Sequence, residues 1–315
     1  MSGFGAQSTT DEVLAGTDLS GRRIYITGGY SGLGKETARA LAACGAEVII
    51  AGRDKAKLDA AASEIEQATG QRIGTSVVDL ASLDSIRACG TQARNSLGRI
   101  DVLINNAGVM ACPFGKTADG FEMQFGTNHL GHFLLTRELM PLIEQGERPR
   151  IVNLSSRGHH MAPVNLDDPN FERRDYNEWA SYGQSKTANV LFTVGLEQRF
   201  GGKGIHAYAV HPGGIQTNLG RHMSEEQAAA LIERVTTNDP GFAWKTIPQG
   251  AATQCWAATA PELEGTGGVY CEDCHVAAID DQSSTGGVRS YALDQDSADR
   301  LWAISEQMVG ASFSA

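Results

Sequence analysis

The chain has 315 residues, of which 41% are hydrophobic and 20% are charged, and its formal net charge is −11. This composition supports a large buried core, and the excess of acidic residues argues against nucleic-acid binding, which needs a basic surface. The chain shows no apolar run long enough to span a bilayer, and its first residues lack the basic start and apolar centre of a secretory signal. We therefore expect a cytoplasmic protein with no membrane span and no nucleic-acid partner.

Residues 1–20 are polar and predict an N-terminal arm, whereas residues 21–315 predict one domain in which apolar and helical segments alternate. Apolar segments such as EVIIAG and DVLIN are mostly apolar on both faces, as expected for parallel strands that helices cover on both sides. Repeated strand-helix-strand units of this kind build doubly wound sheets. The sequence therefore predicts a single-domain α/β Rossmann fold, with a mostly parallel sheet of about seven strands and helices on both faces.

Two later segments of the domain have separate expected roles. Residues from about 213 to 248 form a long excursion between predicted elements, and such excursions often act as lids over substrate sites. Residues from about 297 to 309 carry an apolar stripe at helical spacing, with Ser297 as the expected cap and Gly310 as the expected end. We expect this C-terminal helix to dock on the core.

A glycine-rich segment, TGGYSGLGKET, follows the first predicted strand and opens a helix. Gly28, Gly32 and Gly34, with Ser31 and Leu33 between them, would let a pyrophosphate approach backbone N–H groups at the helix N-terminus. The spacing differs from both the G-x-G-x-x-G fingerprint and the P-loop, so the place in a strand-turn-helix unit supports the interpretation. The alternative is a purely structural glycine turn.

The second predicted strand ends in AGRD, where an NAD-binding fold would place a carboxylate for the ribose hydroxyls. Gly52 stands in its place, and the neighbouring Arg53 offers a forked cation for a 2′-phosphate. This favours NADP(H) over NAD(H) as the cofactor. The alternative is that Arg53 is a solvated surface residue and that Asp54 only caps the next helix.

The segment SYGQSKTANV places Tyr182 and Lys186 four residues apart on one face of a predicted helix. An ammonium group beside a phenol stabilises the phenolate, which would make Tyr182 a better proton donor and acceptor near neutral pH. Ser156 lies at the carboxyl end of another predicted strand, where ligands bind in open α/β sheets, and Asn128 lies within a long predicted helix. These residues suggest one catalytic group.

The segments TGGYSGLG, NNAG, TNHLGHF, VNLSS, YGQSK and HPGGIQT, in this order, resemble the short-chain dehydrogenase/reductase family over residues of about 20 to 275. The flanking text is similar to the retinol-dehydrogenase and WW-domain-oxidoreductase branch. The resemblance implies that Tyr182 is the general acid/base, Lys186 its electrostatic partner, Ser156 the donor to the carbonyl oxygen and Asn128 the anchor of a relay water. It also implies a homodimer or homotetramer, formed through the helix that bears Tyr182.

The same resemblance assigns the remaining cofactor-binding positions. It implies contacts to the adenine, the ribose and the nicotinamide carboxamide from Asp79, Leu80, Asn105, Ala107, Gly108, Pro212, Gly213, Ile215 and Thr217. The implied activity is an NADP(H)-dependent interconversion of an alcohol and a ketone or aldehyde. The expected partner is a small-molecule substrate with a bulky apolar body. A nucleotide-retaining epimerase or dehydratase and a non-catalytic NADP(H) sensor are the alternatives.

Some residues allow two interpretations. His159 and His160 could touch the substrate or be exposed loop residues, and Trp179 could wall the pocket or pack an insertion between Ser156 and Tyr182. Aromatic and sulfur side chains in the excursion would suit an apolar substrate or pack the lid: Met223, Phe242 and Trp244. Cys271 and Cys274 form a CxxC pair without the second half of a zinc site, so we expect no metal.

Overall fold

A computed structural model describes residues 3–221, 223–239 and 241–313 of the chain. Its centre is an eight-stranded sheet in the order β3-β2-β1-β4-β5-β6-β7-β8. The pairs from β3 through β7 are parallel, and only the two-residue β8 runs antiparallel to its neighbour within the described part. This confirms the predicted mostly parallel Rossmann sheet and adds one short edge strand to the expected seven.

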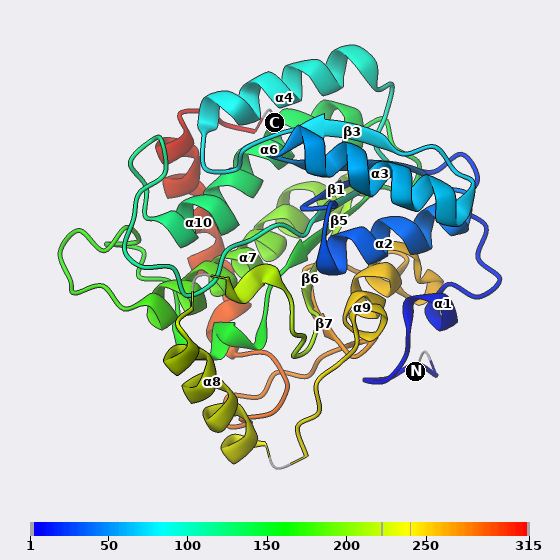
Figure 1. Ribbon diagram of the computed structural model, residues 1–315. Helices are drawn as coiled ribbons and strands as arrows, with labels where there is room; N and C mark the ends of the chain where they lie inside the picture. Colours follow the sequence, from blue (N-terminus) through cyan, green and yellow to red (C-terminus); the bar gives the residue numbers. More distant parts are fainter. Residues whose placement is uncertain (1–2, 222, 240, 314–315) are drawn as a thin grey trace.

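Strands and helices alternate along most of the chain (Figure 1). The strands of the described residues are β1 (Arg23–Thr27), β2 (Glu47–Gly52), β3 (Gly74–Val77), β4 (Val102–Asn105), β5 (Arg150–Leu154), β6 (His206–His211), β7 (Val269–Glu272) and β8 (His275–Val276). The α-helices are α1 (Thr10–Val13), α2 (Gly32–Ala43), α3 (Lys55–Thr69), α4 (Leu83–Ser96), α5 (Met123–Phe125), α6 (Gly131–Ile143), α7 (Glu178–Phe200), α8 (Glu225–Asn238), α9 (Ile247–Thr259) and α10 (Gln295–Val309).

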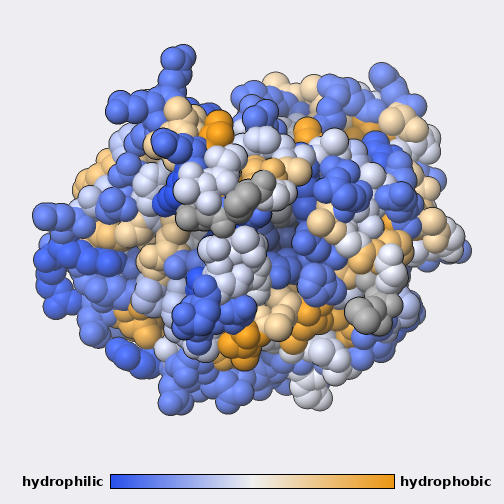
Figure 2. Space-filling model, turned by 90° about the horizontal axis from the view of Figure 1, so that it is seen from below, coloured by the Kyte–Doolittle hydropathy of each residue, from blue (hydrophilic) through white to orange (hydrophobic). Residues whose placement is uncertain are grey.

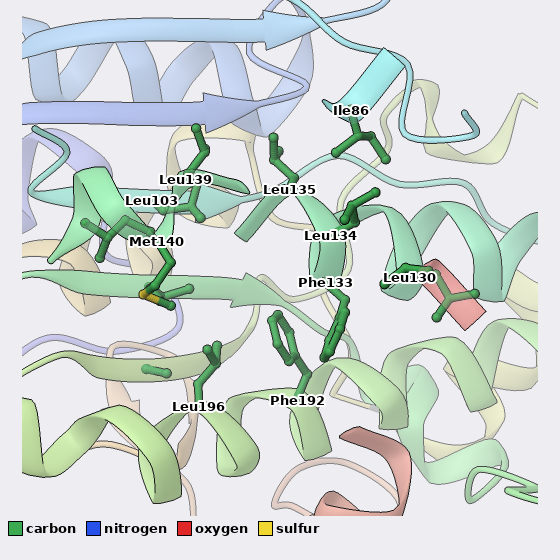
Figure 3. Close-up of a cluster of buried hydrophobic side chains, with 14 of the residues drawn as sticks. Ile86, Leu103, Leu130, Phe133, Leu134, Leu135, Leu139, Met140, Phe192 and Leu196 are labelled. Atoms are coloured by element: carbon green, nitrogen blue, oxygen red, sulfur yellow. The ribbon is translucent and has the colours of Figure 1, made fainter. Parts of the chain in front are cut away.

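Helices cover both faces of the sheet, as the apolar strands require. One layer contains α4, α6, α7 and α10, and the other contains α2, α3 and α9 (Figure 1). In the first layer Phe133 of α6 and Phe192 of α7 point toward one another, with ring centroids 5.2 Å apart (Figure 3). Both rings are fully or nearly fully buried, and burial of such side chains is the main favourable contribution to folding.

The sheet order places β1 beside β4, which are not consecutive in the chain. The chain therefore winds outward from this point in both directions, from β1 to β3 and from β4 to β7. In open parallel sheets such a switch point leaves a crevice at the carboxyl ends of the strands, where ligands bind. The fold thus fixes where a site is expected before any side chain is considered.

The two ends of the chain differ in detail from the sequence prediction. The polar arm predicted at 1–20 contains the short helix α1, which packs against α2 and α9 and buries Val13 and Leu14. At the other end, α10 begins at Gln295 because the carboxylate of Asp294 accepts a hydrogen bond from the Ser297 backbone N–H (2.8 Å). Ser297 is therefore inside the helix and is not its cap, while Gly310 ends the helix in a left-handed conformation.

The surface carries no extended apolar area on the face shown in Figure 2, where hydrophobic residues gather in small groups between hydrophilic ones. None of the helices in the described residues combines the length and the apolar character that a membrane span requires.

Candidate active site

A cleft of about 760 Å³ opens at the carboxyl ends of the central strands. Its wall includes residues that follow β1, β4, β5 and β6, so the switch point of the sheet and the cleft coincide. The sequence-predicted residues that line it are Gly28, Ser31, Gly32, Leu33, Gly34, Ala107, Gly108, Ser156, Tyr182, Lys186, Pro212, Gly213, Ile215 and Thr217. The fold therefore brings most of the predicted nucleotide-binding and catalytic positions to one cavity.

The segment between β1 and α2 requires glycine at three positions, through backbone conformation or lack of space. Gly28 and Gly32 adopt positive φ angles of 67° and 53°, which strongly favour glycine. A Cβ atom at Gly34 would lie 2.5 Å from the Gly28 carbonyl oxygen. Ser31 begins α2 without capping it through its side chain, so the first N–H groups of this helix remain directed at the cleft. Such an uncapped, glycine-lined helix end fits a dinucleotide pyrophosphate.

The end of β2 fits the ribose side of a nucleotide. A Cβ atom at Gly52 would lie 2.6 Å from the ring of Tyr30, which lines the cleft, so this aromatic ring takes the space of the expected carboxylate. Arg53 is exposed and forms no hydrogen bond or ion pair with another described residue. Asp54 caps α3 by accepting from the Lys57 backbone N–H, as the alternative interpretation expected.

Ser156, Tyr182 and Lys186 meet on one wall of the cleft. Tyr182 and Lys186 share a face of α7, and the Lys186 Nζ lies 5.7 Å from the centre of the Tyr182 ring. The Lys186 ammonium also donates to the Leu154 carbonyl (3.1 Å) at the end of β5. The Ser156 Oγ accepts from the Gly158 N–H (3.0 Å), so its hydroxyl can serve as a donor at the cleft, toward Tyr182 or toward another oxygen.

The protonation states of this group differ from the sequence expectation of an acidic phenol. Burial raises the pKa of Tyr182 to about 12, although a hydrogen bond with Ser156 opposes that shift. Burial also lowers the pKa of Lys186 to about 8. The phenol therefore keeps its proton at neutral pH, while the Lys186 ammonium holds its proton less firmly than an exposed lysine does. A neutral phenol is the form that donates a proton.

Asn128 is placed differently from the other predicted catalytic residues. It lies in a π-helical turn (Gly126–Leu130) between α5 and α6, fully buried, and does not line the cleft. Its Oδ1 accepts from the Val109 N–H (2.8 Å), and its Nδ2 donates to the Val109 carbonyl and to Ser185 Oγ (both 2.9 Å). Because both polar groups of the amide are engaged, its side chain fixes the loop after β4 against α7.

His132 extends this buried network to the glycine segment. Its Nδ1 lies 2.9 Å from the Asn128 carbonyl, which only accepts, so Nδ1 carries the hydrogen. Its Nε2 is then the acceptor for the Thr27 hydroxyl (2.9 Å). Thr27 Oγ1 in turn accepts from the backbone N–H groups of Asn106 and Ala107 (2.9 and 3.0 Å). No motif in the sequence indicated this role of His132.

This arrangement predicts a pH-dependent stability. Burial lowers the pKa of His132 from 6.5 to about 4, so the unfolded chain binds a proton that the folded protein excludes between these values. The free energy of unfolding should therefore fall as the pH drops from 7 to 5, by about 2 kcal/mol for this histidine. Denaturant titrations of wild type and His132→Gln at both pH values should show a smaller fall in the variant. Equal falls would contradict the neutral, buried state of His132.

Four predicted cofactor residues lie outside the described lining of the cleft. Asn105 is buried and donates to Asn153 Oδ1 (2.8 Å) and Thr136 Oγ1 (3.0 Å), so it holds β4 in the core. The neighbouring Asn106 lines the cleft instead. The others are Arg53, Asp79 and Leu80. These three belong to the segments that follow β2 and β3, and they lie outside the cleft wall.

Two histidines have positions that sequence reasoning missed. His159, expected to be exposed or to touch the substrate, is buried: its Nδ1 lies 2.8 Å from the Ser156 carbonyl, and its Nε2 accepts from the Arg289 N–H (3.1 Å). His211 Nδ1 accepts from the backbone N–H groups of Arg157 (3.1 Å) and Gly213 (3.4 Å). Both rings therefore hold the loop of Ser156 in place, while His160 lines the cleft.

Comparison with known proteins agrees with this geometry. The sequence profile described as short chain dehydrogenase matches residues 22–228. The chain belongs to the short-chain dehydrogenase family. A "Probable oxidoreductase" of Streptomyces lividans is 42% identical over 299 residues, which cover 93% of this chain and 99% of that protein. Retinol dehydrogenase 14 of Homo sapiens is 40% identical over 307 residues, which cover 93% and 87%.

A solved structure of a protein from Mycobacterium paratuberculosis has a TM-score of 0.73 and 33% sequence identity, and covers 98% of this chain and 100% of that one. The expected family and its retinol-dehydrogenase-like branch are thus confirmed. The protein is an oxidoreductase of the short-chain dehydrogenase family, whose members use a nicotinamide cofactor on small molecules.

The segment predicted as a lid supplies part of the cleft wall of this short-chain dehydrogenase. The segment predicted at about 213 to 248 contains α8, which lies at the lower edge of the view in Figure 1. Trp179 from the start of α7 lines the cleft, together with three residues of the lid segment: Met223, Phe242 and Trp244. These side chains therefore form part of the cleft wall, and Phe242 and Trp244 also pack on one another, with ring centroids 5.0 Å apart.

The CxxC pair of this short-chain dehydrogenase belongs to the core. Cys271 and Cys274 are buried thiols that form no disulfide, and burial raises their pKa, to about 11 for Cys274. A raised pKa lowers the thiolate fraction that redox and metal chemistry need. The described residues contain no group of three or more His, Cys, Asp or Glu side chains that could hold a metal ion.

Proposed function

We propose that this short-chain dehydrogenase interconverts an alcohol and a ketone or aldehyde with NADP(H), using Tyr182 as the general acid/base. The observation that carries the proposal is that Ser156 and Tyr182 lie together on the wall of the cleft that also contains the glycine cradle. The apolar side chains of the lid support a bulky apolar substrate. Net oxidation or reduction of a substrate separates this function from an epimerase or from a non-catalytic sensor.

The cradle, Tyr30, Lys186 and the loop from Pro212 to Thr217 would hold the dinucleotide. When bound, its nicotinamide ring supplies hydride to a carbonyl carbon or takes hydride from an alcohol carbon. The protein side of the reaction is proton transfer. Ser156 donates a hydrogen bond to the carbonyl oxygen, and the neutral Tyr182 phenol gives its proton to that oxygen as negative charge develops on it.

Lys186 supports this transfer through its charge. Loss of a proton from Tyr182 leaves a phenolate in a buried environment, which is costly unless a cation lies nearby. The Lys186 ammonium, on the same face of α7, is the nearest candidate. Asn128, His132, His159 and His211 do not touch the reacting atoms in this scheme and act as positioning residues.

We infer a preference for NADP(H) from the end of β2, where Tyr30 replaces a carboxylate and the unpaired Arg53 is available for a 2′-phosphate. Wild type should use NADPH with a kcat/KM at least about tenfold above that for NADH. Arg53→Ala should remove about tenfold of that preference by raising the KM for NADPH, whereas Arg72→Ala, at another exposed position, should not change it. A wild-type preference for NADH would refute the inference.

Two further parts of the proposal concern the setting of the enzyme. None of the six cysteines forms a disulfide, which supports a reducing compartment such as the cytoplasm. A homodimer or homotetramer is proposed from the family resemblance. Trp302 of α10 packs on Phe192 of α7 within the same chain, so this face of α7 is already covered. A subunit contact would need another surface than the one expected.

A further inference from the structure

The charges around the cleft are opposite to those of the whole chain. The protein has 37 acidic and 26 basic residues, yet the described residues that line the cleft include Lys186 and four arginines but no Asp or Glu. The arginines are Arg157, Arg221, Arg234 and Arg289. The cradle itself binds phosphates through backbone groups, so these side chains need a separate explanation.

Two of the four arginines are already engaged. Arg157 lies 3.5 Å from the Asp239 carboxylate and donates to the Thr285 carbonyl (2.9 Å). Arg289 donates to the backbone carbonyls of Asp280 and Ser283. Both side chains therefore hold loops together, and their N–H groups already have a carboxylate or carbonyl partner within the protein.

Arg221 and Arg234 differ because neither forms an ion pair within the described chain. Arg221 donates to the Asn218 carbonyl (3.0 Å), which carries no net charge. Arg234 of α8 lies over the ring of Trp179, 5.3 Å from its centre, and donates to the weak acceptor Met161 Sδ (3.4 Å). Stacking on an indole fixes a guanidinium while leaving N–H groups at its edge for an anion.

Arg234 lies close to the catalytic phenol. A Cβ atom at Gly158 would lie 2.7 Å from the Tyr182 ring and 3.2 Å from the Met161 methyl group, so the phenol and Met161 flank the same glycine. The Met161 sulfur, which is bonded to this methyl group, accepts from the Arg234 guanidinium (3.4 Å). The thioether end of Met161 therefore lies between the guanidinium and the phenol.

Helix α8 also supplies an apolar path beside this cation. Ala228, Leu231, Ile232 and Val235 line the cleft and have the spacing of one helix face. The helix is held near both ends, since Gln227 donates to Glu178 Oε1 (2.9 Å) and Asp239 pairs with Arg157. Arg234 and the apolar face are thus presented to the cleft as one unit.

We propose that the substrate is amphipathic, with an apolar body along α8 and an anionic oxygen group, carboxylate or phosphate, bound by Arg234. This inference rests on the proposed carbonyl reduction and adds the chemical class of the substrate. Arg221, in the segment before α8, provides a second cation at the cleft. Both arginines are exposed and have no acidic partner among the described residues, so an anionic group of a substrate can reach them, whereas a neutral apolar carbonyl compound would leave their charges unpaired.

The test compares a linear ω-oxo fatty acid, its methyl ester and the matching ω-oxo phosphate monoester as substrates with NADPH. Wild type should reduce the acid or the phosphate with a kcat/KM at least about tenfold above that of the ester, and whichever anion is better identifies the group. Arg234→Met should lower this anion-to-ester ratio about tenfold, with Arg234→Lys in between. Lys203→Met removes a cation remote from the cleft and should leave the ratio unchanged.

An ester that wild type reduces as well as the anions, or a ratio that Arg234→Met does not change, overturns the inference. A binding measurement keeps it separate from the proposed function. Calorimetry on the NADPH-saturated enzyme should show that a saturated fatty acid binds at least about tenfold tighter than its primary amide, and that Arg234→Met removes the difference. If no compound is reduced but this difference is found, carbonyl reduction fails and the anion site stands; equal affinities for acid and amide overturn the anion site.

Discussion

Tyr182→Phe is expected to lower kcat for carbonyl reduction by about 100-fold or more, with the affinity for NADPH retained within about threefold. The change removes one oxygen atom from a buried ring and keeps its shape, so packing in the cleft is preserved. In this structure the phenol has a pKa of about 12 and is neutral, and it is hydrogen-bonded with Ser156. Phenylalanine leaves the forming alkoxide without its proton donor. Single-turnover kinetics and NADPH fluorescence titration measure the two quantities.

Tyr270→Phe is the matched control for this prediction. Tyr270 is also a buried phenol, but it does not line the cleft, and its hydroxyl has no hydrogen-bond partner among the described residues. Its replacement should leave kcat unchanged and the stability equal or slightly higher, because an unpaired buried hydroxyl is costly. If Tyr182→Phe turned over as fast as Tyr270→Phe, Tyr182 would have no part in proton transfer.

The general architecture was predictable because its signals are local and repeated. Runs such as EVIIAG, apolar on both faces, fit only a sheet covered on both sides, and the parallel order follows from the alternation with helices. Gly28, Gly32 and Gly34 were predictable for the same reason, since a strand, a glycine turn and a helix follow one another directly. Tyr182 and Lys186 shared a face once the helix was known.

The roles of buried polar residues were not predictable from their spacing. The contacts of Asn128 depend on a π-helical turn and on the Val109 backbone, which decide where its amide points. His159 reads as a loop residue, yet Arg289, which is remote in sequence, covers its Nε2. The pKa of Tyr182 likewise depends on how much of the surrounding chain excludes water. Each of these features comes from contacts between distant segments, which periodicity does not encode.

The segment predicted as a lid has both predictable and unpredictable features. Its position after β6 and its apolar content were apparent in the sequence, and the structure places Met223, Phe242 and Trp244 at the cleft. The charge pattern appeared only in three dimensions, because the cations of the cleft come from four separate segments of the chain. The proposed substrate class therefore depends on side chains that come together only in the folded chain, whereas short motifs already suggest the reaction type.

Gly34→Ala is expected to weaken NADPH binding by about 100-fold and to lower the free energy of unfolding by about 1–3 kcal/mol. The added Cβ would lie 2.5 Å from both the Gly28 carbonyl oxygen and Asn106 Nδ2. Neither group is free to retreat, since the Gly28 N–H donates to the Ala51 carbonyl (2.7 Å) and Asn106 Nδ2 donates to the Thr27 carbonyl (2.8 Å). The turn that receives the pyrophosphate must therefore shift. Calorimetric titration with NADPH and urea unfolding test both effects.

Gly202→Ala controls for the general effect of adding a methyl group, because no atom lies within 4 Å of its would-be Cβ. This variant should bind NADPH and unfold like wild type. If Gly34→Ala also binds NADPH with wild-type affinity while folded, the cradle does not hold the pyrophosphate. A loss of affinity confined to Gly34→Ala, in protein that is still folded by circular dichroism, is the outcome that links the glycine spacing to nucleotide binding, because the only change is one methyl group at the N-terminus of α2.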